Sequence, residues 1–138
     1  MDPSEIIKML ELSPHPEGGA FRETWRDQPD DGARGHGTAI YYLLKTGERS
    51  RRHRIDATEA WHFYAGDPLE LLIEPPEGPP RTIVLGPDLA AGQRPQVIVP
   101  PDAWQSARPL GAWTLVGCTV SPAFEFEHFE LDDSDSTT

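Results

Sequence analysis

After residue 11 the sequence consists of short runs rich in aromatic and β-branched residues, and proline or glycine separates one run from the next. The chain has 15 prolines and 12 glycines in 138 residues, a composition that fits many turns between short segments. Runs of this kind, bounded by turn residues, are typical of β-strands. The sequence therefore predicts an all-β fold for most of the chain.

About ten short strands with no helical pattern between them indicate a sandwich or a barrel, in which few strand edges are left unpaired. A stiff, exposed loop is expected at residues 75–80, where prolines cluster. The predicted strands cover residues 19–25, 38–44, 51–55, 60–65, 69–74, 81–85, 96–99, 104–108, 113–120 and 125–129.

One short helix is predicted at the N-terminus, over residues 3–11. Asp2 can cap it, Pro3 suits the first helical position, and Glu5 can return a hydrogen bond to the cap. The chain length is that of one domain. We therefore expect a single domain over residues 1–131 and, because residues 132–138 are charged and lack an apolar anchor, a disordered acidic tail.

The net charge of -11 makes nucleic acid polymers and acidic membranes unfavourable partners. Neither a basic segment followed by an apolar signal core nor an apolar stretch near the ~20 residues that cross a bilayer is present, so a cytoplasmic protein is expected. The single cysteine, Cys118, lies in an apolar run and is predicted to be a buried structural thiol.

Four residues near the middle of the chain form a spaced motif, in which a histidine and a glutamate lie between two glycines: Gly47, His53, Glu59 and Gly66. Side chains alternate across a strand, so His53 and Ile55 share one face, and the following strand can bring Glu59 opposite them. The spacing resembles the first motif of the cupins, in which two histidines one residue apart and a glutamate lie between two glycines. Ile55 stands where that motif has its second histidine.

A second stretch, from Gly92 to Gln105, resembles the second cupin motif. Asp102 stands at the place of a glycine, and Gln105 at the place of a histidine. Of the four usual cupin metal ligands, the resemblance thus retains His53 and Glu59 and replaces one by Gln105. These three side chains, with water, can hold a divalent ion, although zinc, copper and nickel sites favour more imidazole or thiolate.

Residues 14–25, 61–69 and 93–96 are similar to those of a subfamily of small RmlC-like cupins predicted to be sugar epimerases, and the similarity extends over residues 5–131. It implies a double-stranded β-helix, the jelly-roll barrel, with a short N-terminal helix. It also implies a homodimer and a pocket for a small molecule at one end of the barrel.

Two residues are the candidate catalytic groups. His53 can take and return a proton near neutral pH. Glu59 can orient His53 or act as a second acid–base group, because burial raises the pKa of a carboxyl. Gln105 can hold a substrate carbonyl or hydroxyl, or satisfy barrel backbone groups instead.

Further candidates line the predicted pocket. Arg22 and Arg51 are expected to contact an anionic group, and Trp104 and Phe124 are expected to wall the pocket, although aromatic residues on strands are more often core. His15 and Glu17 lie in a loop, where a functional role and plain turn chemistry are equally open. His62 follows the opposite alternation from Glu59, Trp61 and Phe63 and should face away.

The leading hypothesis is an isomerase or epimerase that moves a proton beside the carbonyl of a keto-sugar or related metabolite. His53 would be the base, Glu59 its partner, and Gln105 or Arg51 would stabilise the enolate. No cofactor is required on this route. Two alternatives stay open: a non-catalytic cupin that binds a small metabolite or nucleotide, and a divalent-metal-dependent cupin enzyme.

Overall fold

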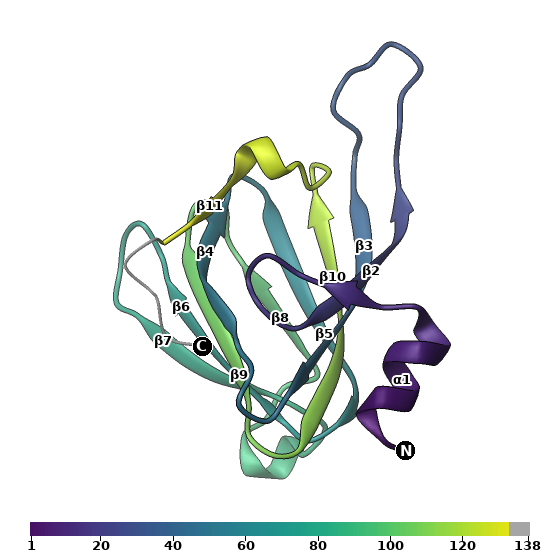
Figure 1. Cartoon of the computed structure of the whole chain (residues 1–138). Helices are drawn as coiled ribbons and strands as arrows, with labels where there is room; N and C mark the ends of the chain where they lie inside the picture. The colour runs from purple at the N-terminus through teal and green to yellow at the C-terminus, as the bar shows by residue number, and fades with distance from the viewer. Residues whose placement is uncertain (133–138) are drawn as a thin grey trace.

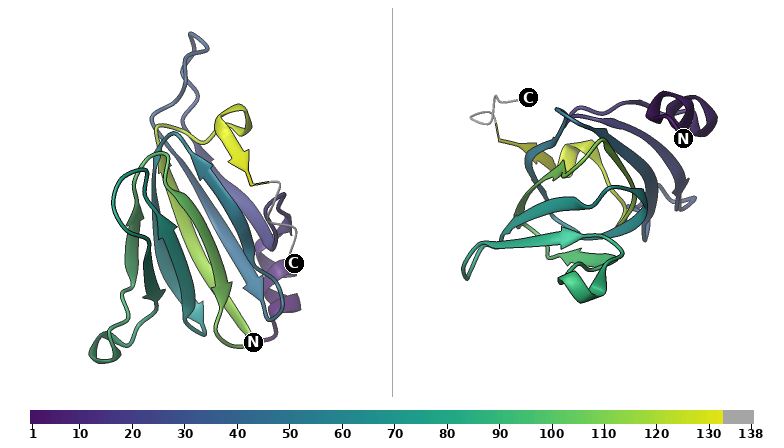
Figure 2. Two further views of the ribbon diagram at one scale, coloured as in Figure 1. Left: turned by 90° about the vertical axis from the view of Figure 1, so that its left-hand side faces the viewer. Right: turned by 90° about the horizontal axis from the view of Figure 1, so that it is seen from below.

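The computed structural model describes residues 1–132 and consists of two antiparallel sheets that curve around a common interior (Figures 1 and 2). The first sheet has the strand order β1-β2-β3-β10-β5-β8, and the second has the order β11-β4-β9-β6-β7. The strands are β1 (Ser13–Pro14), β2 (Ala20–Arg26), β3 (Thr38–Lys45), β4 (Ser50–Ile55), β5 (Thr58–Gly66), β6 (Leu69–Glu74), β7 (Arg81–Leu85), β8 (Gln96–Val99), β9 (Trp104–Pro109), β10 (Trp113–Ser121) and β11 (Phe129–Leu131). The predicted all-β jelly-roll barrel is confirmed.

The helix α1 (Pro3–Leu10) is present, as predicted, and begins with the expected capping box. The Asp2 side chain accepts from the Ser4 backbone N–H at 2.8 Å, and Glu5 accepts from the Asp2 backbone N–H at 3.4 Å. Ile6 is buried and packs with Leu12 and Leu43 on the outside of the first sheet. The interior of the barrel is therefore left to the strands.

The core of the barrel is apolar and follows from the period of two in the strands. In β6 the buried residues Leu69, Leu71 and Ile73 alternate with half-buried neighbours. They belong to one cluster with Leu85 of β7 and Val97 of β8. The proline-rich stretch at residues 75–80 is the connection between β6 and β7, as predicted.

The C-terminal region differs from the predicted strand at 125–129. A 3₁₀ helix, η2 (Phe126–His128), precedes β11, which pairs with β4. A 3₁₀ turn brings residues three apart to the same side, so Phe126 and Phe129 meet with ring centroids 6.0 Å apart. Phe124 joins them, 4.8 Å from Phe126 and 5.9 Å from Phe129.

Of the predicted disordered tail, Asp132 is held in place: its backbone N–H donates to the carbonyl of Arg52, and its carboxylate pairs with the Arg52 guanidinium. Residues 133–138 lie outside the described part of the chain. Within residues 1–132, no helix has the length and apolar character needed to cross a membrane.

Candidate functional site

A cavity is lined by residues of both sheets and by Phe124 and Phe126, which precede β11. Figure 1 shows the segment before β11 crossing one end of the barrel. The volume of the cavity is about 40 Å³, which is room for about three water molecules. The wall combines acidic, imidazole and aromatic side chains with aliphatic ones. It is formed by His15, Glu17, Phe21, Glu23, Thr38, Ile40, Tyr42, His53, Ile55, Glu59, Cys118, Val120, Phe124 and Phe126.

His53 points into the barrel from β4 and is 2 % exposed. Its Nδ1 lies 2.7 Å from the carbonyl oxygen of Arg51. A carbonyl can only accept, so Nδ1 carries a proton and donates it. Nε2 lies 3.1 Å from Oε2 of Glu17. Both ring nitrogens are therefore engaged, and the ring orientation is fixed.

Glu17 is the buried partner of His53. Its Oε1 accepts a hydrogen bond from the Ser50 hydroxyl at 2.6 Å, while Oε2 faces His53. Since Nδ1 of His53 is already protonated, an attractive contact between Nε2 and Oε2 requires one further proton between them. Buried charges persist when they are paired in this way. His53 and Glu17 therefore form one proton-sharing unit.

Glu59 enters the cavity from β5 and is 8 % exposed. Burial is the main cause that raises its pKa to about 7; nearby Glu17 raises it further, and His53 and hydrogen bonds from Gln105 and Cys118 oppose the rise. At neutral pH both protonation states of this carboxyl are populated, which suits a group that gives and takes protons.

A chain of two hydrogen bonds supports Glu59 from below. The indole N–H of Trp61 donates to Oε1 of Gln105 at 2.8 Å, and Nε2 of Gln105 donates to Oε1 of Glu59 at 2.9 Å. Indole is only a donor, so the amide orientation of Gln105 follows from its partners. Gln105 is 1 % exposed and does not line the cavity. Gln105 lies behind Glu59 as seen from the cavity, so it does not contact a ligand bound there.

Cys118 and His15 also line the cavity. Burial raises the pKa of the Cys118 thiol well above its usual value, so Cys118 is no activated nucleophile. Burial lowers the pKa of His15, and its Nδ1 accepts the backbone N–H of Glu17 at 3.1 Å. His15 therefore positions the loop that carries Glu17, and its ring packs edge-on against Phe21 at 4.4 Å.

Arg22 and Glu23 have the reverse of the expected placement. Arg22 is on the outer face of β2, where it donates to Glu11 at 2.8 Å, whereas Glu23 lines the cavity. Arginine at position 22 therefore does not reach the interior. Glu23 pairs with Arg26 through two hydrogen bonds of 2.8 Å, which compensates its charge.

Arg51 also lies outside the cavity, and the reason is a β-bulge in β4. Ser50 pairs with Ala107 and His53 with Gln105, so β4 has one more residue than β9 between these pairs. A bulge interrupts the alternation, so Ser50 and His53 are both buried while Arg51 is half-buried. Its side chain lines a separate surface hollow with Gly47 and Glu48.

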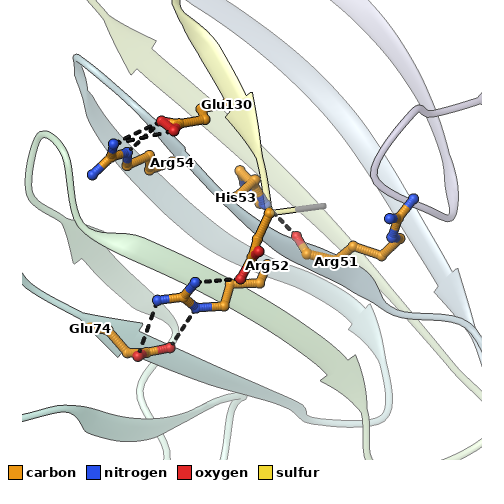
Figure 3. Close-up of polar contacts among 7 residues, drawn as sticks. Arg51, Arg52, His53, Arg54, Glu74 and Glu130 are labelled. Carbon is orange, nitrogen blue, oxygen red and sulfur yellow. Dashed lines mark hydrogen bonds and ion pairs between the residues drawn. The ribbon is translucent and has the colours of Figure 1, made fainter. Parts of the chain in front are cut away.

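Figure 3 shows the neighbours of His53 turned away from it, with Arg52 reaching Glu74 and Arg54 reaching Glu130. Trp104, predicted to wall the pocket, lies against these arginines: their guanidinium carbons are 4.3 and 4.5 Å from its ring centre. Gln105 faces inward, so the preceding residue Trp104 faces outward.

Phe124 lines the cavity, as predicted, and His62 is on the outer face with Thr119, also as predicted. The sequence interpretation missed Phe21, Tyr42 and Glu23 as wall residues. Their positions follow from alternation: Phe21 and Glu23 share one face of β2, and Tyr42 is on the inner face of β3. The alternation of side chains along these strands could be seen in the sequence, but it did not indicate which face of each strand points into the barrel.

The predicted metal ligands do not form a metal site. Within residues 1–132, no group of three or more His, Cys, Asp or Glu side chains is arranged to hold an ion. The amide oxygen of Gln105 accepts from Trp61, and its nitrogen points at Glu59. Ile55 contributes no donor. His53, Glu59 and Gln105 therefore do not fit the metal that cupin folds often carry.

The chain is similar to several solved structures, at high and at low sequence identity. Protein SO0799 from Shewanella oneidensis is 43% identical with a TM-score of 0.90, covering 96% of this chain and 85% of that chain. A hypothetical protein from Leishmania major is 30% identical with a TM-score of 0.86, covering 96% and 88%. An oxalate decarboxylase variant from Bacillus subtilis shares the fold at 12% identity, with a TM-score of 0.67, covering 86% and 29%.

No curated protein matched the chain. The model of a protein family described as Cupin superfamily (DUF985) matches residues 4–132, nearly the whole described chain. The match agrees with the barrel fold. This chain belongs to the DUF985 family of the cupin superfamily.

Proposed function

We propose that the chain is an isomerase- or epimerase-like enzyme that moves a proton at the carbon beside the carbonyl group of a small metabolite, such as a keto-sugar. The observation that carries this proposal is the pairing, in one cavity, of Glu59, with a pKa of about 7, and the proton-sharing unit of His53 and Glu17. A base and an acid of this kind are what enolisation needs.

Glu59 is the proposed base. Its carboxylate takes the proton from the carbon beside the carbonyl, and a raised pKa makes it a stronger base than an ordinary glutamate. The carbonyl oxygen gains the negative charge of the broken C–H bond. The proton held between His53 and Glu17 passes to that oxygen, giving a neutral enol and a protonated Glu59.

The reverse transfers complete the reaction. If Glu59 returns its proton to the same carbon, the enol hydroxyl gives its proton back to the His53–Glu17 unit and the original carbonyl re-forms. If Glu59 instead protonates the former carbonyl carbon of an enediol, the hydroxyl on the neighbouring carbon gives its proton to the His53–Glu17 unit and becomes the new carbonyl. This assignment exchanges the roles expected from sequence, because both nitrogens of His53 are engaged whereas the carboxyl of Glu59 lines the cavity. Gln105 and Arg51 do not contact the substrate in it.

Only the reacting end of a sugar fits the cavity of about 40 Å³. The rest of the molecule would extend past Phe126, which lines the cavity and is 54% exposed. Phe126 can stack on the apolar face of a sugar ring. We propose that a sugar substrate, as the resemblance to predicted sugar epimerases suggests, binds in this way, with its reacting end in the cavity and its ring on Phe126.

The test is deuterium exchange from heavy water into a panel of keto-sugars and shorter hydroxyketones, followed by NMR. We expect exchange with wild type and a loss of about 10²-fold or more in Glu59→Gln. The matched control is Glu77→Gln, which makes the same change in the exposed loop between β6 and β7. Ligand binding without exchange in wild type would instead favour the non-catalytic binding cupin.

A further inference from the structure

Within residues 1–132, the cavity wall carries acidic side chains but no lysine or arginine, a combination that does not favour the binding of an anion. Three carboxyl side chains, Glu17, Glu23 and Glu59, contribute to the wall, and in the described chain no lysine or arginine does. The neighbouring arginines are engaged outside the cavity: Arg26 pairs with the wall residue Glu23, Arg22 pairs with Glu11, and Arg51 lines an outer hollow. A carboxylate or phosphate entering the cavity would therefore meet carboxyl groups, two of which already have a partner in His53 or Arg26, and no lysine or arginine of the described residues on the wall.

The two imidazoles of the wall do not supply the missing positive partner. His53 is committed to Glu17 through Nε2 and to the Arg51 carbonyl through Nδ1. Nδ1 of His15 accepts the N–H of Glu17, and burial among aromatic rings disfavours its charged form. An anion in the cavity would lose its hydration without gaining a charged partner.

The remainder of the wall suits an uncharged molecule. Phe21, Ile40, Ile55, Val120 and Phe124 provide apolar surface. Carboxyl and imidazole groups at one side accept or donate hydrogen bonds to a carbonyl or hydroxyl. The volume of about 40 Å³ limits the buried part to a few heavy atoms.

We infer that the part of the substrate that enters the cavity is uncharged: a short ketone or hydroxyketone unit, with any carboxylate or phosphate excluded from the carbons beside the reacting carbonyl. This inference rests on the proposed function and narrows its substrate class. It separates the chain from the oxalate decarboxylase that shares its fold, because the named substrate of that enzyme is a dianion.

The experiment compares hydroxyacetone with pyruvate, two ketones of similar size that differ in charge. Binding is followed by the side-chain NMR signals of His15 and His53, and His62 on the outer face is the internal control. We expect hydroxyacetone to bind at least about ten-fold more tightly than pyruvate. Equal or tighter binding of pyruvate would overturn the inference, and so would the lack of any response to hydroxyacetone.

A charge substitution at the cavity wall sharpens the test. Glu23→Lys places a cation there and releases Arg26 from its partner, so it should improve pyruvate binding several-fold relative to Glu23→Gln, which removes the carboxylate without adding a cation. Unchanged pyruvate binding in Glu23→Lys would count against the inference.

The same samples separate this inference from the proposed function. Hydroxyacetone that binds but takes up no deuterium would refute the proton transfer and leave the charge preference intact. Pyruvate that binds more tightly and exchanges its methyl protons would refute the charge preference and leave the proton transfer intact.

Discussion

Trp61 donates its indole N–H to the amide oxygen of Gln105, and this one bond determines which end of the amide faces Glu59. The three residues come from β5 and β9, so the contact also joins the two sheets beneath the cavity. The amide nitrogen that faces Glu59 donates to its carboxylate and favours the ionised form. Two residues without contact to the cavity thereby set the basicity of one that lines it.

The first prediction concerns Gln105→Leu. The variant keeps the side-chain volume roughly constant but removes the donor to Glu59, so the pKa of Glu59 should rise above its wild-type value of about 7. Carbon NMR of labelled glutamate would measure it. Gln105→Met, another uncharged side chain of similar length that has no N–H donor, serves as the comparison. A pKa unchanged in both variants would contradict the relay.

The second prediction concerns stability and pH. The pKa of Glu59 is raised from 4.5 to about 7 in the fold, so between these values the folded state binds more protons than the unfolded state. Stability should therefore be lost as pH rises from about 4.5 through about 7, by up to roughly 3 kcal/mol. Glu59→Gln should remove this loss, which urea unfolding at several pH values measures. Parallel pH profiles for wild type and Glu59→Gln would contradict it.

The third prediction concerns the pH dependence of proton exchange. The proposed base must be ionised, so the exchange rate should rise with pH through about 7 and level off above it. The rate into a neutral hydroxyketone, measured by NMR from pH 5 upward, gives the profile. A rate that falls through the same range would make protonated Glu59 the required form and reverse its role.

The fourth prediction concerns metal. Ile55 and Gln105 stand at the two positions where the cupin pattern has a histidine and this chain does not, so the double variant Ile55→His, Gln105→His should bind a divalent ion such as nickel far more tightly than wild type. Elemental analysis after dialysis against the ion measures the occupancy. Stoichiometric metal in the wild type, lost in Glu59→Ala, would instead favour the metal-dependent cupin.

The fifth prediction is the homodimer that the cupin resemblance implies. Tyr64 of β5 and Ile98 of β8 are large side chains exposed on the first sheet, 52% and 48% respectively, and apolar groups of this kind are enriched where copies pair. Sedimentation should give the mass of two chains, and Ile98→Lys should shift it toward one. A single-chain mass for wild type would contradict the dimer.

The sequence pattern was sufficient to predict the short strands and the helix, because these depend on alternation, turn residues and capping. The choice of a jelly-roll barrel and the grouping of Gln105 with His53 and Glu59 came from the resemblance to the cupin motifs. The sequence pattern was not sufficient to place Arg51, because a bulge changes the facing of residues without leaving a pattern in the sequence. Trp104 could have been placed, because it precedes the inward-facing Gln105 and alternation turns it outward. Glu17 could be named only as a loop residue, because loop geometry depends on contacts with distant strands.

The extra residue in β4 also shows how little of that strand the site depends on. Ser50 and His53 are three positions apart, and in a strand of regular alternation they would lie on opposite faces; the bulge turns both of them inward. A deletion of either Arg51 or Arg52 would restore regular pairing with β9 and leave Ser50 and His53 two positions apart, so alternation alone would keep both partners of Glu17 inside. A chain one residue shorter between Ser50 and His53 should therefore keep the site, whereas removal of the bulge without a deletion should turn one of the two side chains outward.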